Sequence, residues 1–179
     1  MKPEAEMMGP PKKPSQPPEM QVFAPLIGTW TGTAEMIEPS AEEMKKHMPP
    51  GSPEPQMTYA GGGTYKWDIN DLYIHAEGWH DMGEGEKAHY HEFIGWDPVK
   101  KMYHSWYVSD YGERGDGWMT ASADGKKFTV KTSGLGMGGK PAKGEGTMTI
   151  VDDNTVEWTW NENGAMGRMK MKGTMKKQS

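Results

Sequence analysis

Apolar and polar residues alternate with a period of two along most of this chain, in short runs separated by turn residues. Val156, Trp158 and Trp160 form the clearest run, with turn residues at 152–154 before it and 161–164 after it. Such alternation is typical of strands that bury one face. We count about eight to ten such runs and hardly any helical pattern. The sequence therefore predicts an all-β, up-and-down antiparallel barrel with a short N-terminal helical turn.

Residues 1–18 are rich in proline, lysine, glutamate and methionine, and we expect a disordered or loosely attached arm there. Residues 19–179 are predicted to form a single barrel domain. The chain has no cysteine, which excludes disulfides and thiolate sites. Its net charge of −5 with scattered lysines argues against a nucleic-acid partner. No apolar run is long enough for a membrane span and no hydrophobic signal region is evident, so a cytoplasmic location and export with removal of a leader both remain open.

Five of the six histidines lie between residues 72 and 110, a stretch that reads as three consecutive antiparallel strands. Residues 97–100, Asp-Pro-Val-Lys, predict the turn between the second and third of them. If the first and last residues of this turn pair, Phe93 lies opposite His104. His91 then lies opposite Trp106, and the two imidazoles are diagonal neighbours.

This register divides the two strands into two faces. One face carries His89, His91, Phe93, Met102, His104, Trp106 and Val108. The other carries Tyr90, Glu92, Ile94, Tyr103, Ser105 and Tyr107. A turn longer by one residue would instead group Glu92 with His104 and Trp106. We favour the first register because its apolar residues alternate cleanly.

The preceding strand also has two distinct faces. One carries Tyr73, His75, Glu77 and Trp79, and the other carries Leu72, Ile74, Ala76, Gly78 and His80. If the more apolar face points into the core, His75 and Glu77 face outward and His80 lies at the strand's end. The opposite choice places His75 and Glu77 inward beside His91. With either choice, this strand can contribute one imidazole to a site inside the barrel.

Imidazoles on neighbouring strands can converge on a single ion and leave a coordination position open for water or substrate. We therefore predict a divalent metal centre inside the barrel, holding Zn, Fe, Mn or Cu, and possible metal-dependent catalysis. The hypothesis requires that the imidazoles face an enclosed space together. Histidines on a solvated outer face, or in hydrogen bonds within a ligand pocket, are the alternative. The candidate ligands are His75, Glu77, His80, His89, His91 and His104.

The same sequence is also compatible with other functions. A barrel of this size can enclose one small ligand, and a metal-free carrier of an apolar molecule would use aromatic walls. A haem protein needs one axial imidazole, and an acid–base enzyme needs a histidine with a carboxyl or phenol partner. An interaction protein would use the arm and the rim loops. Candidate ligand-binding residues are Phe93, Trp106, Trp118 and Trp158, and candidate catalytic residues are Glu92, Tyr90 and Tyr107.

The segment Pro25-Leu26-Ile27-Gly28-Thr29-Trp30-Thr31-Gly32 resembles the opening of a bacterial lipocalin-like β-barrel family of unknown function. Residues 93–97 and 151–154 extend the resemblance, which covers most of residues 25–177. Nitrobindin-like haem barrels open similarly and are the second family. The first resemblance implies a fold without a site. In such a barrel the indole of Trp30 plugs one end, and Lys176 or Lys177 from the last strand stacks on it.

Residues 37–56 interrupt the strand pattern. Ser40 followed by Glu43 is a capping-box pattern and predicts a short helix that runs to His47. A loop of this size is either a lid over the barrel mouth or a tolerated insertion. We expect His47 to be solvated.

Overall fold

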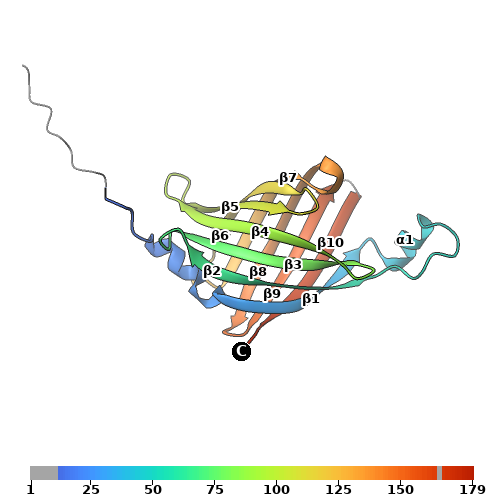
Figure 1. The fold of residues 1–179 in the computed structure, drawn as a ribbon, viewed down its shortest axis with the longest axis horizontal. Coiled ribbons are helices and arrows are strands. Elements are labelled where there is room, and N and C mark those ends of the chain that lie inside the picture. Colours follow the sequence, from blue (N-terminus) through green and yellow to red (C-terminus); the bar gives the residue numbers. More distant parts are fainter. Residues whose placement is uncertain (1–11, 165–166) are drawn as a thin grey trace, which may run out of the picture.

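The described part of the chain, residues 12–164 and 167–179 of a computed structural model, forms ten strands in one closed antiparallel barrel. Each strand pairs with its neighbours in the chain, and β10 returns to pair with β1 (Figure 1). The predicted up-and-down barrel is therefore confirmed. Most of the predicted arm, residues 1–11, lies outside the described residues. No described helix has the length and apolar character needed to cross a membrane.

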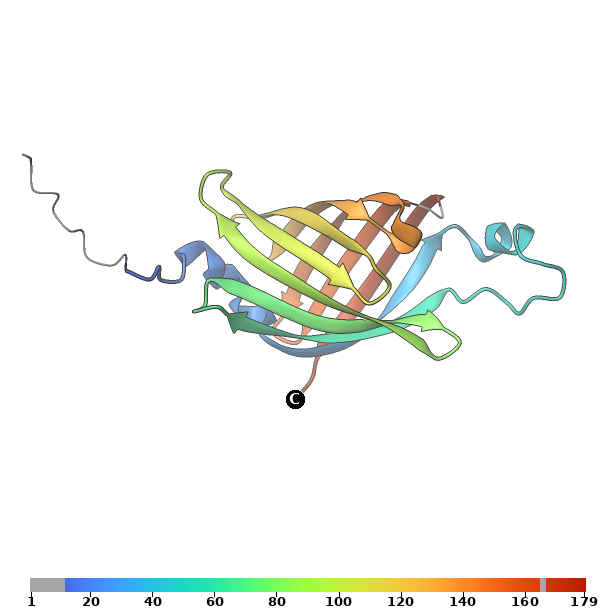
Figure 2. The same cartoon turned by 45° about the horizontal axis from the view of Figure 1, so that its top comes forward.

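The elements follow the order η1 (Pro18–Leu26), β1 (Gly28–Glu38), α1 (Ala41–Lys46), β2 (Thr58–Asp68), β3 (Tyr73–Gly83), β4 (Glu86–Asp97), β5 (Met102–Ser109), β6 (Arg114–Ala121), β7 (Lys127–Leu135), η2 (Met137–Gly139), β8 (Pro141–Asp152), β9 (Thr155–Gly164) and β10 (Gly167–Lys177). The short 3₁₀ helix η1 is the predicted N-terminal helical turn, and it lies at one end of the barrel (Figures 1 and 2).

That end of the barrel is filled by apolar side chains. Trp30 is 1% exposed, and its indole N–H donates to the carbonyl oxygen of Leu26 at 2.7 Å. Lys177 Nζ lies 5.4 Å from the centre of the indole and donates to the Pro25 carbonyl at 3.1 Å. The predicted plug and stacked cation are both confirmed, with Lys177 as the cation. The buried cluster around them is Met20, Phe23, Leu26, Trp30, Ile74, Ile94, Tyr103, Met119, Phe128, Ile150 and Val156.

The turn between β4 and β5 is longer than expected. Asp97 pairs with Met102, two residues later than expected, because its carboxylate accepts hydrogen bonds from the backbone N–H groups of Val99 and Lys100 at 2.8 and 2.9 Å and so stabilises a longer turn. The expected pairs of Phe93 with His104 and of His91 with Trp106 are therefore wrong. The shift is two residues, an even number, so the predicted division of the two strands into faces is retained.

The faces of β4 and β5 do not point in the direction that the metal hypothesis requires, whereas on β3 the first alternative holds, with the apolar face inward and His75 and Glu77 outward. Ile74 and Ala76 on β3 are 1% exposed and Ile94 on β4 is 5% exposed, so their faces point into the barrel. The face that carries His89, His91 and His104 therefore points outward. The physical reason is that a closed barrel buries one face of every strand, and the Ile74 and Ile94 face is the more apolar. The imidazoles of His89, His91 and His104 therefore do not meet in the interior, where the metal hypothesis requires them.

The insertion between β1 and β2 contains the predicted helix. Ser40 Oγ accepts a hydrogen bond from Glu43 N at 3.3 Å, and Glu43 Oε2 accepts one from Ser40 N at 2.8 Å, which completes the capping box. Helix α1 has no buried residue and projects beyond the barrel in both views (Figures 1 and 2). His47 is exposed, as expected. The arrangement favours a tolerated insertion over a lid.

Candidate functional site

A cavity of about 390 Å³ lies inside the barrel, beyond the apolar plug. Leu26, Met119 and Phe128 form its floor, and they belong to the buried cluster at the η1 end. At the other end, its lining includes Glu113, the residue before β6, and Gly136, the residue before η2. The plug therefore closes the cavity at the η1 end, and the cavity reaches the loops at the opposite end of the barrel.

Glycines make room for aromatic walls. A Cβ atom on Gly146 would lie 2.7 Å from the indole of Trp160, and one on Gly173 would lie 2.5 Å from the indole of Trp158. Each indole therefore occupies the space over a glycine of a neighbouring strand, an arrangement known from other sheets. This packing keeps two large rings against the wall and leaves the centre hollow.

Polar side chains gather on one side of this cavity. Glu92 on β4 lies opposite Tyr107 on β5, and Ser105 follows on the same inner face. The Tyr107 hydroxyl donates to Glu113 Oε2 at 3.3 Å, and the Ser109 hydroxyl donates to the same oxygen at 3.1 Å. The cavity thus has an apolar floor and a polar side wall, which is the composition of many small-molecule sites.

The three predicted catalytic candidates all belong to this inward-facing wall. Glu92 and Tyr107 line the cavity, and Tyr90 follows on the same face of β4. Sequence reasoning missed Tyr65 and Glu113. Tyr65 lies on β2 opposite Ala76, which is 1% exposed and faces inward, but this pairing was not assigned from the sequence.

Burial changes the pKa values of the carboxyl and phenol groups in this wall. It raises the pKa of Glu92, and the neighbouring Ser105 hydroxyl partly offsets the change. It also raises the pKa of Tyr90 to about 12 and raises that of Tyr107, where Glu113 acts in the same direction. For Tyr65, the neighbouring Tyr90 is the larger cause of a pKa well above the usual value, and burial is the second. The phenols therefore remain protonated near neutrality.

His80 is the only one of the six histidines, all of them in the described ranges, that belongs to the inner face of the sheet. It follows Ala76 and Gly78 on the buried side of β3, and its ring centre lies 6.2 Å from that of Tyr90. Burial lowers its pKa from 6.5. A haem-binding barrel, the second family resemblance, would have to use this imidazole.

The outward-facing histidines form two separate groups. His75 Nε2 lies 3.0 Å from His91 Nδ1, whereas His104 stacks on Trp118 at 4.0 Å and its Nε2 lies 3.1 Å from Asp116. His104 pairs with Gly95, four residues along β4 from His91, which corresponds to about 13 Å. The expected diagonal contact between His91 and His104 is therefore wrong.

The predicted aromatic residues of a ligand pocket are mostly on the outside. Phe93 and Trp106 pair with each other on the face that carries His91, and Trp118 stacks on the outward-facing His104. Trp158 faces inward, but Trp160 is the tryptophan that lines the cavity. Three of the four candidates are excluded from the cavity for the same reason as the histidines, because they lie on the outer side of the wall.

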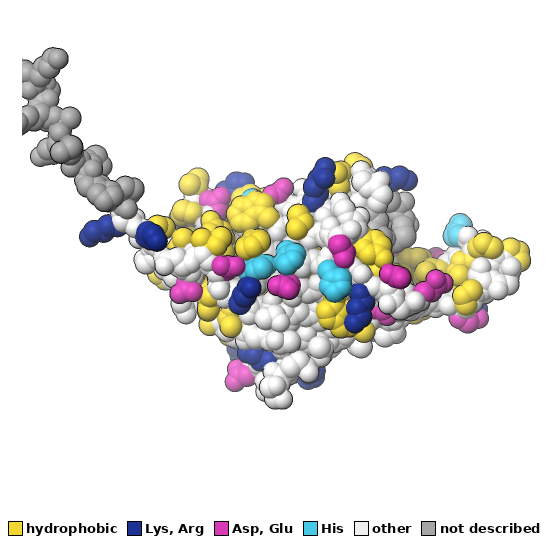
Figure 3. All heavy atoms as spheres, viewed as in Figure 1, with side chains coloured by type: hydrophobic (Ala, Val, Ile, Leu, Met, Phe, Trp, Pro, Cys, Tyr) yellow, Lys and Arg dark blue, Asp and Glu magenta, His cyan; other side chains and the backbone are white. Residues whose placement is uncertain are grey.

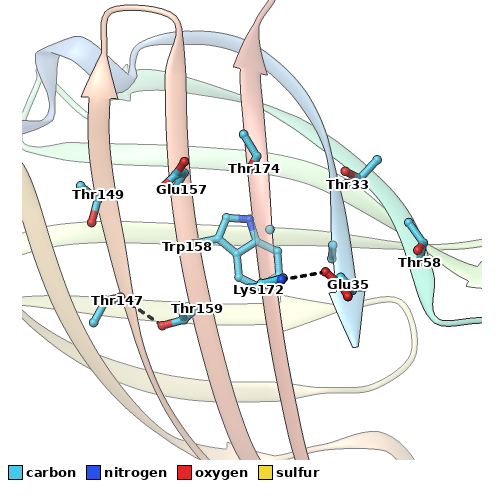
Figure 4. A pocket seen from close by; sticks show the side chains of 12 residues that line it. Thr33, Glu35, Thr58, Thr147, Thr149, Glu157, Trp158, Thr159, Lys172 and Thr174 are labelled. Atoms are coloured by element: carbon cyan, nitrogen blue, oxygen red, sulfur yellow. Dashed lines mark hydrogen bonds and ion pairs between the residues drawn. The ribbon is translucent and has the colours of Figure 1, made fainter. Parts of the chain in front are cut away.

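A second hollow, of about 510 Å³, lies along the outer side of β8, β9, β10 and β1 (Figure 4). Threonines dominate it, and the hydroxyls of Thr147 and Thr159 lie 3.0 Å apart. Lys172 forms an ion pair of 3.0 Å with Glu35 in the same hollow. Four of its side chains thus pair with one another, and none of its lining residues is buried, so we assign the candidate site to the interior.

Comparison with protein families gives one match. A family described as "Protein of unknown function (DUF1579)" matches residues 15–177. The chain belongs to this family. The predicted membership of an uncharacterised barrel family is confirmed to that extent, and its bacterial, lipocalin-like character stays a prediction.

Two solved structures are similar to this DUF1579 chain to different degrees. The crystal structure of Rv2717c from M. tuberculosis is 11% identical, with a TM-score of 0.60 over 92% of this chain and 100% of that chain. A redesigned β-barrel, b11L5F_LGL, is 11% identical, with a TM-score of 0.46 over 88% of this chain and 96% of that one. No curated protein matches. At this identity the likeness to Rv2717c concerns the fold alone.

Proposed function

We propose that this DUF1579 barrel binds a small organic molecule in its interior, and that the molecule has an apolar body and a cationic or hydrogen-bond-donating head group. The observation that carries the proposal is a cavity of about 390 Å³ with an apolar floor and a carboxyl group, Glu92, in its wall. This volume falls at the smaller end of the range of about 300–1,000 Å³ that is usual for ligand sites.

The floor supports an apolar body. Leu26, Met119 and Phe128 are each less than a tenth exposed and present hydrocarbon or ring surface to the cavity. Transfer of apolar surface from water onto such a floor is favourable by about 25 cal/mol per Å². Methionine side chains in the lining, such as Met148, adapt to ligands of irregular shape.

The charges support the proposed head group. Glu92, Glu113 and Glu162 contribute carboxyl groups to the lining. Trp160 Nε1 donates to Glu162 Oε2 at 3.2 Å, and Tyr107 and Ser109 donate to Glu113. Glu92 is half-buried and has the Ser105 hydroxyl as its partner. Arg114 also lines the cavity but is exposed. An amine or another donor would complete the set of hydrogen bonds around Glu92.

A panel of amphipathic amines, each matched with a carboxylic acid of the same carbon skeleton, tests the proposal by tryptophan fluorescence and thermal shift. We expect the amines to bind more tightly than the acids. Glu92→Gln keeps the shape of the side chain and removes the charge, so amine affinity should fall by about tenfold or more. Val130→Phe should fill the cavity and abolish binding of the whole panel.

Glu145→Gln is the matched control, because Glu145 is an exposed residue outside the cavity lining and its change should leave every affinity unaltered. Equal binding of amines and acids, or equal effects of Glu92→Gln and Glu145→Gln, would contradict the proposed head group. Binding that survives Val130→Phe would contradict the proposed location.

A further inference from the structure

The outer side of β3 and β4 brings two imidazoles and a carboxylate together. One donor atom from each of His75, Glu77 and His91 lies within 4.8 Å of the other two. Glu77 is directly opposite His91 in the strand pairing, and His75 precedes Glu77 by two residues on the same face. Figure 3 shows histidine and acidic side chains side by side on this surface. Strand pairing alone therefore holds three metal-ligating groups in register.

His75 is unusual for a residue on an outer face. It is only 9% exposed, and its ring stacks on Phe93 with centres 4.3 Å apart and planes 6° apart. Its Nε2 atom faces His91 Nδ1 at 3.0 Å. The imidazole is thus fixed in position and orientation by packing, as the first ligand of a metal site needs to be.

The other ring nitrogen of His75 is buried and has no hydrogen-bond partner among the residues that the structure describes. The Asp68 carboxylate lies 3.4 Å from this Nδ1 atom, too poorly oriented for a hydrogen bond in the present arrangement. Metal-bound histidines usually direct the N–H of the second nitrogen to a carboxylate, which fixes the tautomer and raises the basicity of the ligand. Asp68 stands where such a group would be.

We propose that His75 Nε2, His91 Nδ1 and the Glu77 carboxylate bind a divalent transition-metal ion of the zinc class, with Asp68 as the group that orients His75. Tetrahedral zinc with Zn–N bonds of about 2.0–2.1 Å separates two nitrogen ligands by about 3.3 Å. The ring nitrogens lie 3.0 Å apart, so the ion requires them to separate by only a few tenths of an ångström.

The donor set selects the class of ion. Two imidazoles with one carboxylate suit zinc and its neighbours, whereas calcium and magnesium take oxygen ligands. His91 and Glu77 are exposed, so the remaining coordination positions face solvent and are open to water or another small ligand. The site lies on the opposite face of the sheet from Glu92 and is independent of the proposed cavity ligand.

Isothermal titration of untagged, chelator-treated protein with zinc chloride tests the assignment. We expect one equivalent to bind. His91→Ala and Glu77→Gln alter exposed side chains and should each weaken binding at least tenfold. Asp68→Asn retains an oxygen that can accept the hydrogen bond from Ile69 N, and it should weaken binding by about tenfold to a hundredfold.

His89→Ala is the matched control, because His89 is an exposed imidazole on the same strand and face, two residues from His91. The His89→Ala variant should bind zinc with the same affinity as the unaltered protein. The Glu92→Gln variant should also bind zinc with unaltered affinity. Imidazole ¹⁵N spectra should show zinc-dependent shifts at His75 and His91 together. Failure to bind one equivalent, or an equal loss in His89→Ala and His91→Ala, would overturn the site.

Discussion

Adjacent residues of β4 belong to the two sites proposed above. His91 points outward to His75, whereas Glu92 points inward to the cavity wall. The separation follows from the pleat of a strand, which sends successive side chains to opposite faces. The two proposed sites therefore share one strand, and a substitution in one of them makes no direct contact with the other.

His80 leads to a prediction about pH. Burial lowers its pKa below 6.5 in the folded protein, with a smaller contribution in the same direction from His89, while Glu113 and Asp110 oppose the change. The unfolded chain therefore binds a proton at this residue more readily than the folded chain does. Its contribution to stability is complete above about pH 6.5 and is lost as the pH falls through the folded-state pKa.

We expect the free energy of unfolding to fall less in His80→Gln than in the unaltered protein when the pH is lowered from about 7.5 to about 5. Urea unfolding at a series of pH values measures the difference. His47→Gln is the control, because His47 is exposed in the loop after α1. If the free energy of unfolding changed with pH in the same way in His80→Gln and in the unaltered protein, His80 would not contribute to the pH dependence of stability.

At the scale of elements, inward-facing glycines allow the strands to approach closely and bend. Gly32 on β1 faces β10, and a Cβ atom there would meet the Thr174 carbonyl oxygen and lie 2.8 Å from Met175 Cα. Both atoms are backbone, so they cannot move aside without opening the pairing that closes the barrel. Gly61 lies on β2 directly opposite Gly32 and has more space, because a Cβ atom there would lie 3.3 Å from its nearest neighbour, the Trp79 carbonyl oxygen.

Gly32→Ala should therefore lower the free energy of unfolding by about 2–4 kcal/mol. Gly61→Ala, the same change on the paired residue, should cost less than about 1 kcal/mol. Chemical unfolding of the two variants measures both values. Equal losses would mean that the loss of glycine itself, and not the close approach of β1 to β10, determines the cost.

At the scale of the molecule, the two ends of the barrel differ. Helix η1 and Trp30 close one end, while α1 and its loops extend from the other without burying a residue. Gln56 ties the end of this insertion to Asp81 on β3 through a hydrogen bond of 2.9 Å. The stable part of the molecule is thus the barrel with its plug.

Replacement of residues 41–54 by a short glycine–serine linker should change the free energy of unfolding by less than about 1 kcal/mol, because the cost of loop closure varies slowly with length. Thermal unfolding and the amine titration measure stability and cavity binding in the same variant. Unchanged affinity would agree with a tolerated insertion, whereas a large loss of affinity would show that the insertion covers the mouth when ligand is bound.

The local pattern was sufficient for much of the fold. Period-two alternation and turn residues predicted the barrel, the capping box predicted α1, and Gly28 with Trp30 predicted the plugged end. These features depend on residues close together in the chain. The division of β4 and β5 into faces was also correct, because the error in the turn was an even number of residues.

The sequence by itself thus determined which side chains share a face, and it identified His75, Glu77 and His91, and Glu92 with Tyr90 and Tyr107, as candidates. Only the tertiary structure decided which face is inside. That choice depends on all ten strands burying their more apolar sides together, and no single strand contains the information. Closure of the barrel therefore placed Glu92 and the phenols on the inner face of the sheet, and it placed the imidazoles other than His80 on the outer face.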